Sequence, residues 1–518
     1  MKRLFETDHL VADLKGRSVR GGVASLGAQA AKLVLQLGST VVLARLLSPR
    51  DYGLFGMAAI VTGFLGLFHD MGLSVVTVQR EKITHSEVTA LFWLNAATGL
   101  LIALLALAFA PLVAWFFDEP RLGPVVAALA VAFVLGGAAV QHQALLRRQM
   151  RFGRIALLET LAMLAGTAAG IWAAAAGLRY WSLALMQLAT SAATLLLSLL
   201  LCRWLPGRPR RGADLRGLLR FGAHLMGFNV VNYLGKSADT ALLGWRWGPV
   251  PVGFYGNARK LMQLPITQVN APFTQVALPA LSRIPEEPER YRAAYVRVVE
   301  KLLLLVMPGV AYLIAVSDWL VALLLGPQWT ECAGLFAILG IGALLEPICS
   351  STGWLLISQG RSREMVAMGI CDAALRFGLI ALALPWGATG VAVAVIARLV
   401  ISGPLSILVA GRRGPVGARH MARTLVAPGA AACGAFAAAL AARWLLAPAS
   451  AVAGLLLCGL CAAPAAVLVL YATRSGRRAI RDAFRSLADL RRPSPPAPLP
   501  SPEEELADTM RRPGDLRG

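Results

Sequence analysis

Long apolar runs separated by short polar segments dominate the hydrophobic pattern of this chain. They recur from near residue 22 to near residue 471, and each is long enough to cross about 30 Å of hydrocarbon. In lipid, every backbone polar group must find its partner within its own helix or within a closed barrel. The runs are too long and too rich in Ala and Leu for barrel strands. The pattern therefore predicts an all-α polytopic membrane protein.

The runs predict about fourteen transmembrane helices. They lie near residues 22–47, 53–79, 88–117, 124–146, 157–177, 181–203, 218–247, 252–281, 298–325, 331–357, 364–384, 387–410, 424–446 and 451–471.

The helices and loops predict a division into seven regions. These are a cytoplasmic amphipathic N-terminus (1–21), an N-lobe of helices one to six (22–204), a basic cytoplasmic linker (205–217), a C-lobe of helices seven to twelve (218–411), two additional helices (424–471), a basic amphipathic helix (472–492) and a disordered cytoplasmic tail (493–518). Leu and Phe recur at helical spacing among arginines in 472–492, which is typical of a helix on an anionic membrane surface. A solvated helix packed on nearby loops is an equal alternative. The final stretch is Pro-rich and then acidic, which predicts disorder.

Two stretches of the chain resemble each other at an offset of 200 residues. Pro49, Gly53 and Gly56 return as Pro249, Gly253 and Gly256. The preceding helix repeats at the same offset, since polar positions 29, 32, 36 and 39 are polar again at 229, 232, 236 and 239. A shared offset across a turn and a helix indicates duplication. Duplicated helical halves are typical of transporters, which bind their substrates between the repeats.

Composition supports a membrane protein and sets its orientation. The chain is 57% hydrophobic, with mean hydropathy +0.63, and only 15% of its residues are charged. With the N-terminus inside, cytoplasmic loops carry about 23 Lys and Arg and outer loops about 6, as the positive-inside rule requires. We therefore expect a multi-pass protein of the plasma membrane with both termini cytoplasmic. The asymmetry also explains the net charge of +22 without a nucleic-acid partner.

The loops carry no recognisable catalytic chemistry. The sequence contains no phosphate-binding Gly-rich loop, no nucleophile elbow and no HExxH motif. Its seven cysteines have no zinc-site spacing with histidine. We therefore expect neither an enzyme nor a bound metal or cofactor.

Polar stripes inside the expected helices are the strongest functional signal, because intramembrane charge is costly. The stripes follow helical spacing, so each lies on one helix face. The candidate substrate-binding residues on them are Gln29, Lys32, Gln36, Asn229, Asn232, Lys236, Arg259, Lys260, Gln263 and Asn270. One stripe could be a hydrogen-bonding seam between helices. Three stripes, two of them related by the repeat, favour a hydrated cavity.

Further charges lie deep in the expected helices. Asp372 and Arg376 are four residues apart and can pair on one helix face, either as a structural pair or as an ion-coupling site. Asp239 could pair with Lys236, and Glu346 could be a polar group satisfied at a proline kink. Asp239, Glu346, Asp372 and Arg376 are the candidate ion-coupling residues, and Arg398 joins the candidate substrate-binding set. Cations outnumber carboxylates at these depths, which favours an anionic substrate.

Three segments carry a resemblance to a known family. Residues 44–53 (ARLLSPRDYG), 145–152 (LLRRQMRF) and, more weakly, 355–361 (LLISQGR) resemble the polysaccharide exporters, the flippases of O-antigen and colanic acid. This family belongs to the multidrug/oligosaccharidyl-lipid/polysaccharide (MATE-like) exporter superfamily. The resemblance covers the chain to about residue 475. It implies two six-helix lobes around a central cavity, here with two extra helices, in the bacterial inner membrane.

The resemblance also implies a substrate and a mechanism. The substrate would be an undecaprenyl-diphosphate-linked oligosaccharide, flipped by alternating access with an ion gradient as the energy source. Membrane lipids, and a polysaccharide polymerase and glycosyltransferases, are the implied partners. Two alternatives remain open at this point. One is a cation-coupled exporter of small molecules, of the multidrug type, and the other is a non-transporting membrane scaffold for glycan-synthesis enzymes.

Overall fold

The computed structural model describes residues 14–70, 72–80, 83–208, 215–448, 450–473, 476–478 and 481, with only the backbone for 14–26 and 215–228. Helices make up nearly all of these residues. They are α2 (Leu14–Leu46), α3 (Pro49–Gly66), α4 (Leu73–Gln79), α5 (His85–Phe116), α6 (Leu122–Arg148), α7 (Phe152–Ala175), α8 (Trp181–Cys202), α9 (Leu215–Trp247), α10 (Pro249–Ser282), α11 (Pro288–Ala315), α12 (Ser317–Leu324), α13 (Thr330–Ser358), α14 (Ser362–Ala383), α15 (Gly387–Arg412), α16 (Ala418–Leu446) and α17 (Ala451–Ala472). Two short 3₁₀ turns, η2 (Pro327–Trp329) and η3 (Leu384–Trp386), complete the set.

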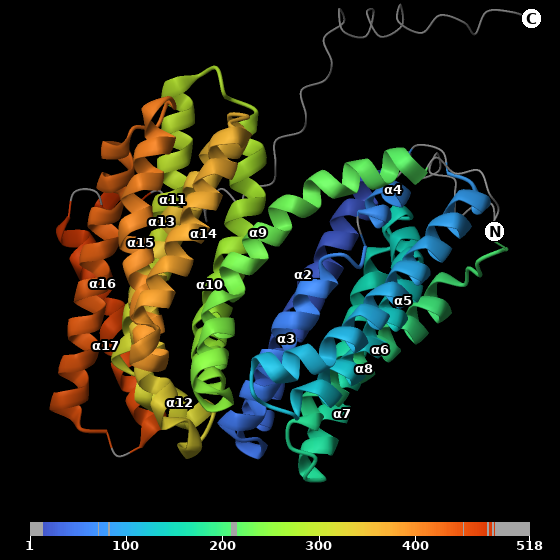
Figure 1. Ribbon diagram of the computed structural model, residues 1–518. Coiled ribbons are helices and arrows are strands. Elements are labelled where there is room, and N and C mark those ends of the chain that lie inside the picture. The colour runs from blue at the N-terminus through green and yellow to red at the C-terminus, as the bar shows by residue number, and fades with distance from the viewer. Residues whose placement is uncertain are drawn as a thin grey trace, which may run out of the picture.

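The helices form two groups that stand side by side in Figure 1. In the N-lobe, α5 packs on α6, α7 packs on α8, and α2 packs on α7. In the C-lobe, α13 packs on α10, α11 and α15, while α14 lies against α9 and α15. The last two helices, α16 and α17, pack on each other and on α11 at the outer flank of the C-lobe. The prediction of an all-α polytopic membrane fold is confirmed.

Ten stretches of the described residues are long and apolar enough to cross a membrane. One of them, Ser362–Arg412, contains both α14 and α15. The long helices α3, α9 and α10 are not among the ten. These three helices pack on one another where the two lobes meet. Each of these three helices therefore packs part of its surface against protein, which is where intramembrane polar groups are tolerated.

Two of the expected helices are broken, so their predicted bounds were wrong. The run 53–79 ends as α3 at Gly66 and restarts as α4 at Leu73. Gly72 adopts a positive φ of 75° between them, and the Asp70 carboxylate accepts hydrogen bonds from the backbone N–H and the hydroxyl of Ser74. Polar side chains of this kind satisfy the free N–H groups at the start of a helix. A hydropathy pattern does not detect such a start inside an apolar run.

The second broken run is 298–325. It comprises α11, which begins ten residues earlier at Pro288, and α12, which starts after Val316. The added turns of α11 are amphipathic and arginine-rich, so the apolar signal starts too late. The break is held by Arg443, whose guanidinium donates to Asp318 at 2.6 and 2.8 Å and to the carbonyl of Ala315 at 3.2 Å.

The lobes meet at one end of the molecule, at the bottom of Figure 1, where α2 turns into α3 and α9 turns into α10. Here the two repeated glycines face each other. A Cβ atom on Gly53 would lie 1.7 Å from the carbonyl oxygen of Pro249, and one on Gly253 would lie 1.9 Å from that of Pro49. This reciprocal contact is what two copies of one unit produce when they pack about a two-fold axis. We call this contact between α3 and α10 the joint.

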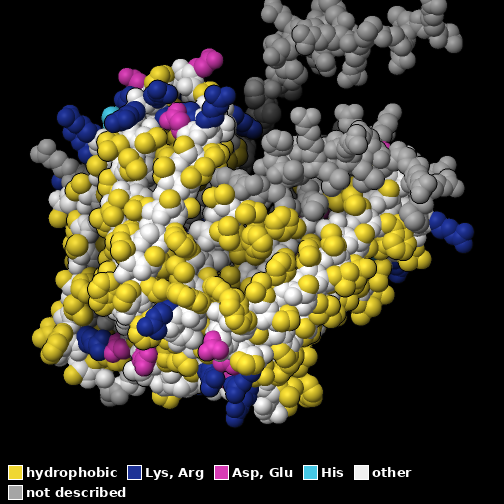
Figure 2. Space-filling model, in the orientation of Figure 1, with side chains coloured by type: hydrophobic (Ala, Val, Ile, Leu, Met, Phe, Trp, Pro, Cys, Tyr) yellow, Lys and Arg dark blue, Asp and Glu magenta, His cyan; other side chains and the backbone are white. Residues whose placement is uncertain are grey.

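The surface agrees with membrane insertion. Figure 2 shows a broad apolar surface between two ends at which charged side chains gather. Highly exposed tryptophans such as Trp115, Trp172, Trp386 and Trp444 lie at or near the joint-side ends of their helices. Tryptophan is enriched at membrane–water interfaces, so these residues mark one boundary of the bilayer.

Several predicted regions lie partly or wholly outside the described residues. Of the N-terminal segment 1–21, residues 1–13 are not described, and α2 has already begun at Leu14. Of the linker 205–217, residues 209–214 are not described. The predicted amphipathic helix 472–492 and tail 493–518 lie almost entirely outside them.

Candidate functional site

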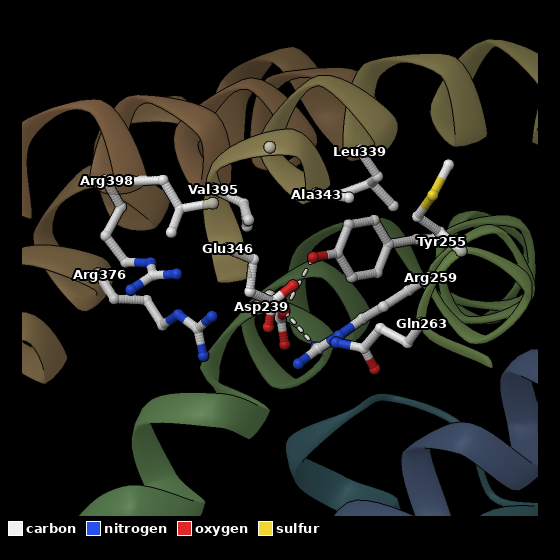
Figure 3. Close-up of a pocket in the computed structure, with 13 residues that line it drawn as sticks. Asp239, Tyr255, Arg259, Gln263, Leu339, Ala343, Glu346, Arg376, Val395 and Arg398 are labelled. Atoms are coloured by element: carbon white, nitrogen blue, oxygen red, sulfur yellow. Dashed lines mark hydrogen bonds and ion pairs between the residues drawn. The ribbon is translucent and has the colours of Figure 1, made fainter. Parts of the chain in front are cut away.

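A small polar cavity lies inside the C-lobe, between α9, α10, α13, α14 and α15 (Figure 3). The volume of the cavity is about 50 Å³. A single water needs roughly 10–15 Å³ by this measure, so the cavity has room for a few waters or an ion and not for a sugar. Its polar lining is Asp239, Tyr255, Arg259, Gln263, Glu346, Arg376 and Arg398.

The structure therefore brings six of the predicted site residues together. They come from segments up to 159 residues apart (239 to 398), and only the packing of five helices makes them neighbours. The apolar part of the wall, which includes Leu339, Ala343 and Val395, comes from α13 and α15. Those side chains keep the polar groups away from lipid.

Asp239 is the central hydrogen-bond acceptor in one half of the cavity. It is 1% exposed and accepts hydrogen bonds from the Tyr255 hydroxyl at 2.8 Å and the Arg259 guanidinium at 2.5 Å. The backbone N–H of Thr240 donates to its other oxygen at 2.8 Å. A buried carboxylate needs such partners to remain charged. The suggested Lys236–Asp239 pair is therefore wrong, because α10 supplies the cation instead.

Arg398 and Asp372 form the second ion pair, between α15 and α14. One guanidinium nitrogen of Arg398 donates to both Asp372 oxygens, at 2.6 and 2.8 Å. Arg376 does not pair with Asp372, as their spacing suggested, but donates to the backbone carbonyl of Gly235 at 3.1 Å. The spacing allowed a pair within α14, yet neighbouring helices offered both residues better-placed partners.

Glu346 is the second carboxylate that lines the cavity, and its side chain is bonded differently from that of Asp239. Among the described residues it makes neither a hydrogen bond nor an ion pair through its side chain. Figure 3 shows it pointing from α13 toward the region occupied by Asp239 and Arg259. The buried Nε atoms of Arg376 and Arg398 are also without partners in the described structure. Three guanidinium groups line the cavity with two carboxylates, and a third carboxylate, Asp372, pairs with Arg398 beside it.

The other predicted residues lie outside this cavity. Lys32 on α2 pairs with Glu159 on α7, within the N-lobe. Glu159 was not among the predicted site residues, although it is a lone carboxylate in the apolar run 157–177. Away from the cavity, the remaining predicted residues are exposed or half-buried: Gln29, Gln36, Asn229, Asn232, Lys236, Lys260 and Asn270.

Lys236 and Lys260 stand apart from the other deep cations. Both are exposed, and neither side chain has a bonding partner in the described part of the chain. Lys236 lies eleven residues before the end of α9, and Lys260 lies eleven residues after the start of α10. At 1.5 Å per residue both are about 16 Å from the joint end, so they share one depth in the membrane.

Both lysines also face the N-lobe. Lys260 follows Gly253 by seven residues, which is nearly two turns, and Gly253 packs on α3. Lys236 follows Tyr233 by three residues, and the Tyr233 hydroxyl donates to the α3 carbonyl of Ile60 at 2.8 Å. Helical spacing therefore places both lysines on the faces of α9 and α10 that turn toward α3.

Tyr255 is the cavity residue that sequence reasoning missed as a site residue. Tyr255 lies 200 residues after Phe55 in the repeated segment, so the shared aromatic ring accounts for the residue without its hydroxyl. Tyr255 precedes Arg259 by four residues on α10, which places both on the face that meets Asp239. That spacing was the available signal.

Comparison with known proteins identifies the family. The family model described as polysaccharide biosynthesis protein matches residues 42–334, more than half of the chain. This chain belongs to that family. The lipopolysaccharide biosynthesis protein WzxC of Escherichia coli (strain K12) is 27% identical over 354 residues, which is 67% of this chain and 71% of that protein.

A second relative is the succinoglycan biosynthesis transport protein ExoT of Rhizobium meliloti (strain 1021). It is 25% identical over 358 residues, covering 66% of this chain and 72% of that protein. Among solved structures, the lipid II flippase MurJ in an inward closed conformation superposes with a TM-score of 0.68 at 11% identity, covering 87% of this chain and 98% of MurJ. That likeness establishes the shared fold.

Proposed function

We propose that this protein is a flippase that moves an undecaprenyl-diphosphate-linked oligosaccharide across the bacterial inner membrane. The observation that carries the proposal is the pair of unpartnered lysines, Lys236 and Lys260, at one depth on the faces of α9 and α10 that turn toward α3. Two comparisons support the proposal: the chain belongs to the polysaccharide biosynthesis family, and one of its relatives is named a transport protein.

The two lysines would bind the diphosphate. An ammonium group deep in a membrane protein is costly unless it meets water or an anion, and a diphosphate offers charge-assisted hydrogen bonds to both. Lys32 is less suited to this role, because Glu159 already neutralises it. Polar side chains on α2, α9 and α10 would contact the sugars: Gln29, Gln36, Asn229, Asn232 and Asn270. The lipid tail would remain in the bilayer throughout.

The C-lobe cavity would serve energy coupling rather than glycan binding, since it is far too small for a sugar. Glu346 is the best candidate for the group that gains and loses a proton or binds the coupling ion. Asp239 and Asp372 are already held by Arg259 and Arg398. A change of charge at Glu346 would disturb the balance of three guanidinium groups and three carboxylates, and α9 and α10 would carry that change to the lobe interface.

The remaining parts of the proposal follow from the same arrangement. Both termini would be cytoplasmic, the joint end would face the periplasm, and the lobes would rock about the joint. A glycan polymerase and glycosyltransferases would be the partners that supply and consume the substrate. The unpartnered lysines Lys236 and Lys260 favour an anionic substrate, whereas a multidrug-type exporter would carry cations.

The experiment replaces the two lysines in a strain that lacks its own flippase. Lys236→Ala and Lys260→Ala should each lower export of the lipid-linked glycan about 10- to 100-fold, because each removes a hydrogen bond between charged groups worth about 1.5–3 kcal/mol. Lys→Arg at the same positions should retain most export, and Lys301→Ala on α11 serves as the matched lysine control. Normal surface glycan in both alanine variants, at equal protein abundance, would refute diphosphate binding and leave a scaffold role as the better explanation.

A further inference from the structure

The C-terminal end of α2 is capped by residues of the other lobe. The Trp329 indole N–H donates to the carbonyl of Ala44 at 2.8 Å, and the Gln328 amide donates to the same carbonyl at 2.8 Å. In the opposite direction, the Arg45 guanidinium donates to the carbonyl of Leu323 at 2.7 Å. Trp329 is fully buried, with its ring edge-to-face against Tyr52 at 5.3 Å and Phe254 at 5.9 Å. The two aromatic partners come from α3 in the N-lobe and α10 in the C-lobe.

The sequence explains why these carbonyls are available. A helix leaves its last carbonyls without partners, and the residues that follow can often satisfy them. Here the N–H of Ser48, which could reach Ala44, donates instead to the Asp51 carboxylate at 3.0 Å as part of the capping box of α3. The next residue, Pro49, has no N–H to offer Arg45. The turn after α2 therefore leaves the carbonyls of Ala44 and Arg45 without a local donor, and side chains of the C-lobe donate to them instead.

The repeated turn in the C-lobe lacks this feature. Gly248 replaces Ser48 and Pro251 replaces Asp51, so no capping box forms there. The N–H of Gly248 is free to donate to the carbonyl of Gly244 at 3.0 Å. The N-lobe contacts this turn through apolar groups, because Phe117 and Met57 lie against Gly244. Among the described residues, the hydrogen-bonded contact therefore exists on one side of the two-fold relation only.

We infer that Trp329, Gln328 and Arg45 form a clasp that keeps the joint end of the transporter closed. Release of this clasp is the step that lets the two lobes separate at the joint and opens the region between them to that side. The inference rests on the proposed alternating access. Directional hydrogen bonds to helix-end carbonyls break when the lobes separate by one or two ångströms, and the carbonyls at the joint end can then bind water. Such a contact stabilises one state while allowing the other, as a two-state gate requires.

The test measures accessibility of the joint from the periplasm. Val252 is 2% exposed, and its side chain lies where a Cβ on Gly56 of the other lobe would contact it at 3.3 Å. Val252→Cys, in a full-length variant whose seven native cysteines are replaced, is labelled in spheroplasts with a membrane-impermeant maleimide. Trp329→Phe keeps a six-membered aromatic ring and removes the indole N–H donor, and Gln328→Met removes the second donor.

Trp329→Phe should raise the labelling rate of the thiol introduced by Val252→Cys about five-fold, the bias expected from one ordinary hydrogen bond. The double variant with Gln328→Met should raise the rate further. The matched control is Trp247→Phe, because the Trp247 indole also donates to a backbone carbonyl at 2.8 Å, that of Leu384 within the C-lobe. It should leave labelling unchanged.

Unchanged labelling in the double variant, or an equal rise with Trp247→Phe, would overturn the inference. If Trp329→Phe lowers protein abundance, Gln328→Met alone decides the question, since Gln328 is exposed and its loss creates no cavity. Failure of the clasp would leave the effects of Lys236→Ala and Lys260→Ala on export intact, so the two proposals fail separately.

Discussion

Alanine at Gly53 should separate the two lobes at the joint. The added Cβ would lie 1.7 Å from the carbonyl oxygen and 2.4 Å from the carbonyl carbon of Pro249. Both obstacles are backbone atoms of a helix, so no side-chain rotation can relieve the clash. To restore an ordinary contact near 3.4 Å, α3 and α10 must move apart by more than an ångström. Small residues permit such close approach between membrane helices, and these glycines occupy the closest point of it.

The free-energy cost can be worked from two opposing terms. Overpacking a well-packed contact costs about 1–3 kcal/mol, and a rigid backbone obstacle places Gly53→Ala at the upper end. Alanine also gains about 1 kcal/mol over glycine in a helix. The net loss should therefore be about 2 kcal/mol. Gly256→Ala provides the control, because nothing lies within 4 Å of its added Cβ, and this variant should be neutral or slightly stabilising.

The assay is unfolding of the purified protein by SDS titration in mixed micelles, for Gly53→Ala, Gly253→Ala and the double variant. A single helix displacement makes room for both methyl groups, so the double variant should cost clearly less than the sum of the single variants, by about 1 kcal/mol or more. Additive costs, or a Gly53→Ala loss no larger than that of Gly256→Ala, would show that the two glycines do not form the contact that joins the lobes.

Two further predictions concern topology and coupling. A reporter fused after Gly207 or Gly414 should give a cytoplasmic signal and one after Gly326 a periplasmic signal, and a periplasmic signal at Gly207 would refute the proposed orientation. Glu346→Gln, which keeps size and removes the charge, should abolish the dependence of glycan export on the ion gradient while the protein still folds. Asp372→Asn should instead lower stability by about 1–2 kcal/mol, because it removes the charged partner of Arg398 in a pair that is partly exposed. Gradient dependence that survives Glu346→Gln would assign coupling to another group.

The sequence by itself determined the class of fold, because a membrane leaves few choices. Apolar runs long enough to span the bilayer must be helices, and their order along the chain was correct except where α3 gives way to α4 and α11 to α12. Local polar chemistry made those breaks, through Asp70 at the start of α4 and Arg443 beside α12. The repeat was also visible, since Gly53 and Gly253 are identical residues in matching turns.

The tertiary structure alone decided which charges meet. Helical periodicity places a side chain on a face, but it does not say which helix that face will meet. Lys236 and Asp239 share a helix, as do Asp372 and Arg376, yet Asp239 pairs with Arg259 and Asp372 pairs with Arg398. A neighbouring helix can present a long guanidinium directly at a carboxylate, whereas residues one turn apart point along the same surface. For the same reason, Lys32 meets Glu159 on α7, and only the packed helices show that the side chains of Lys236 and Lys260 have no bonding partner among the described residues.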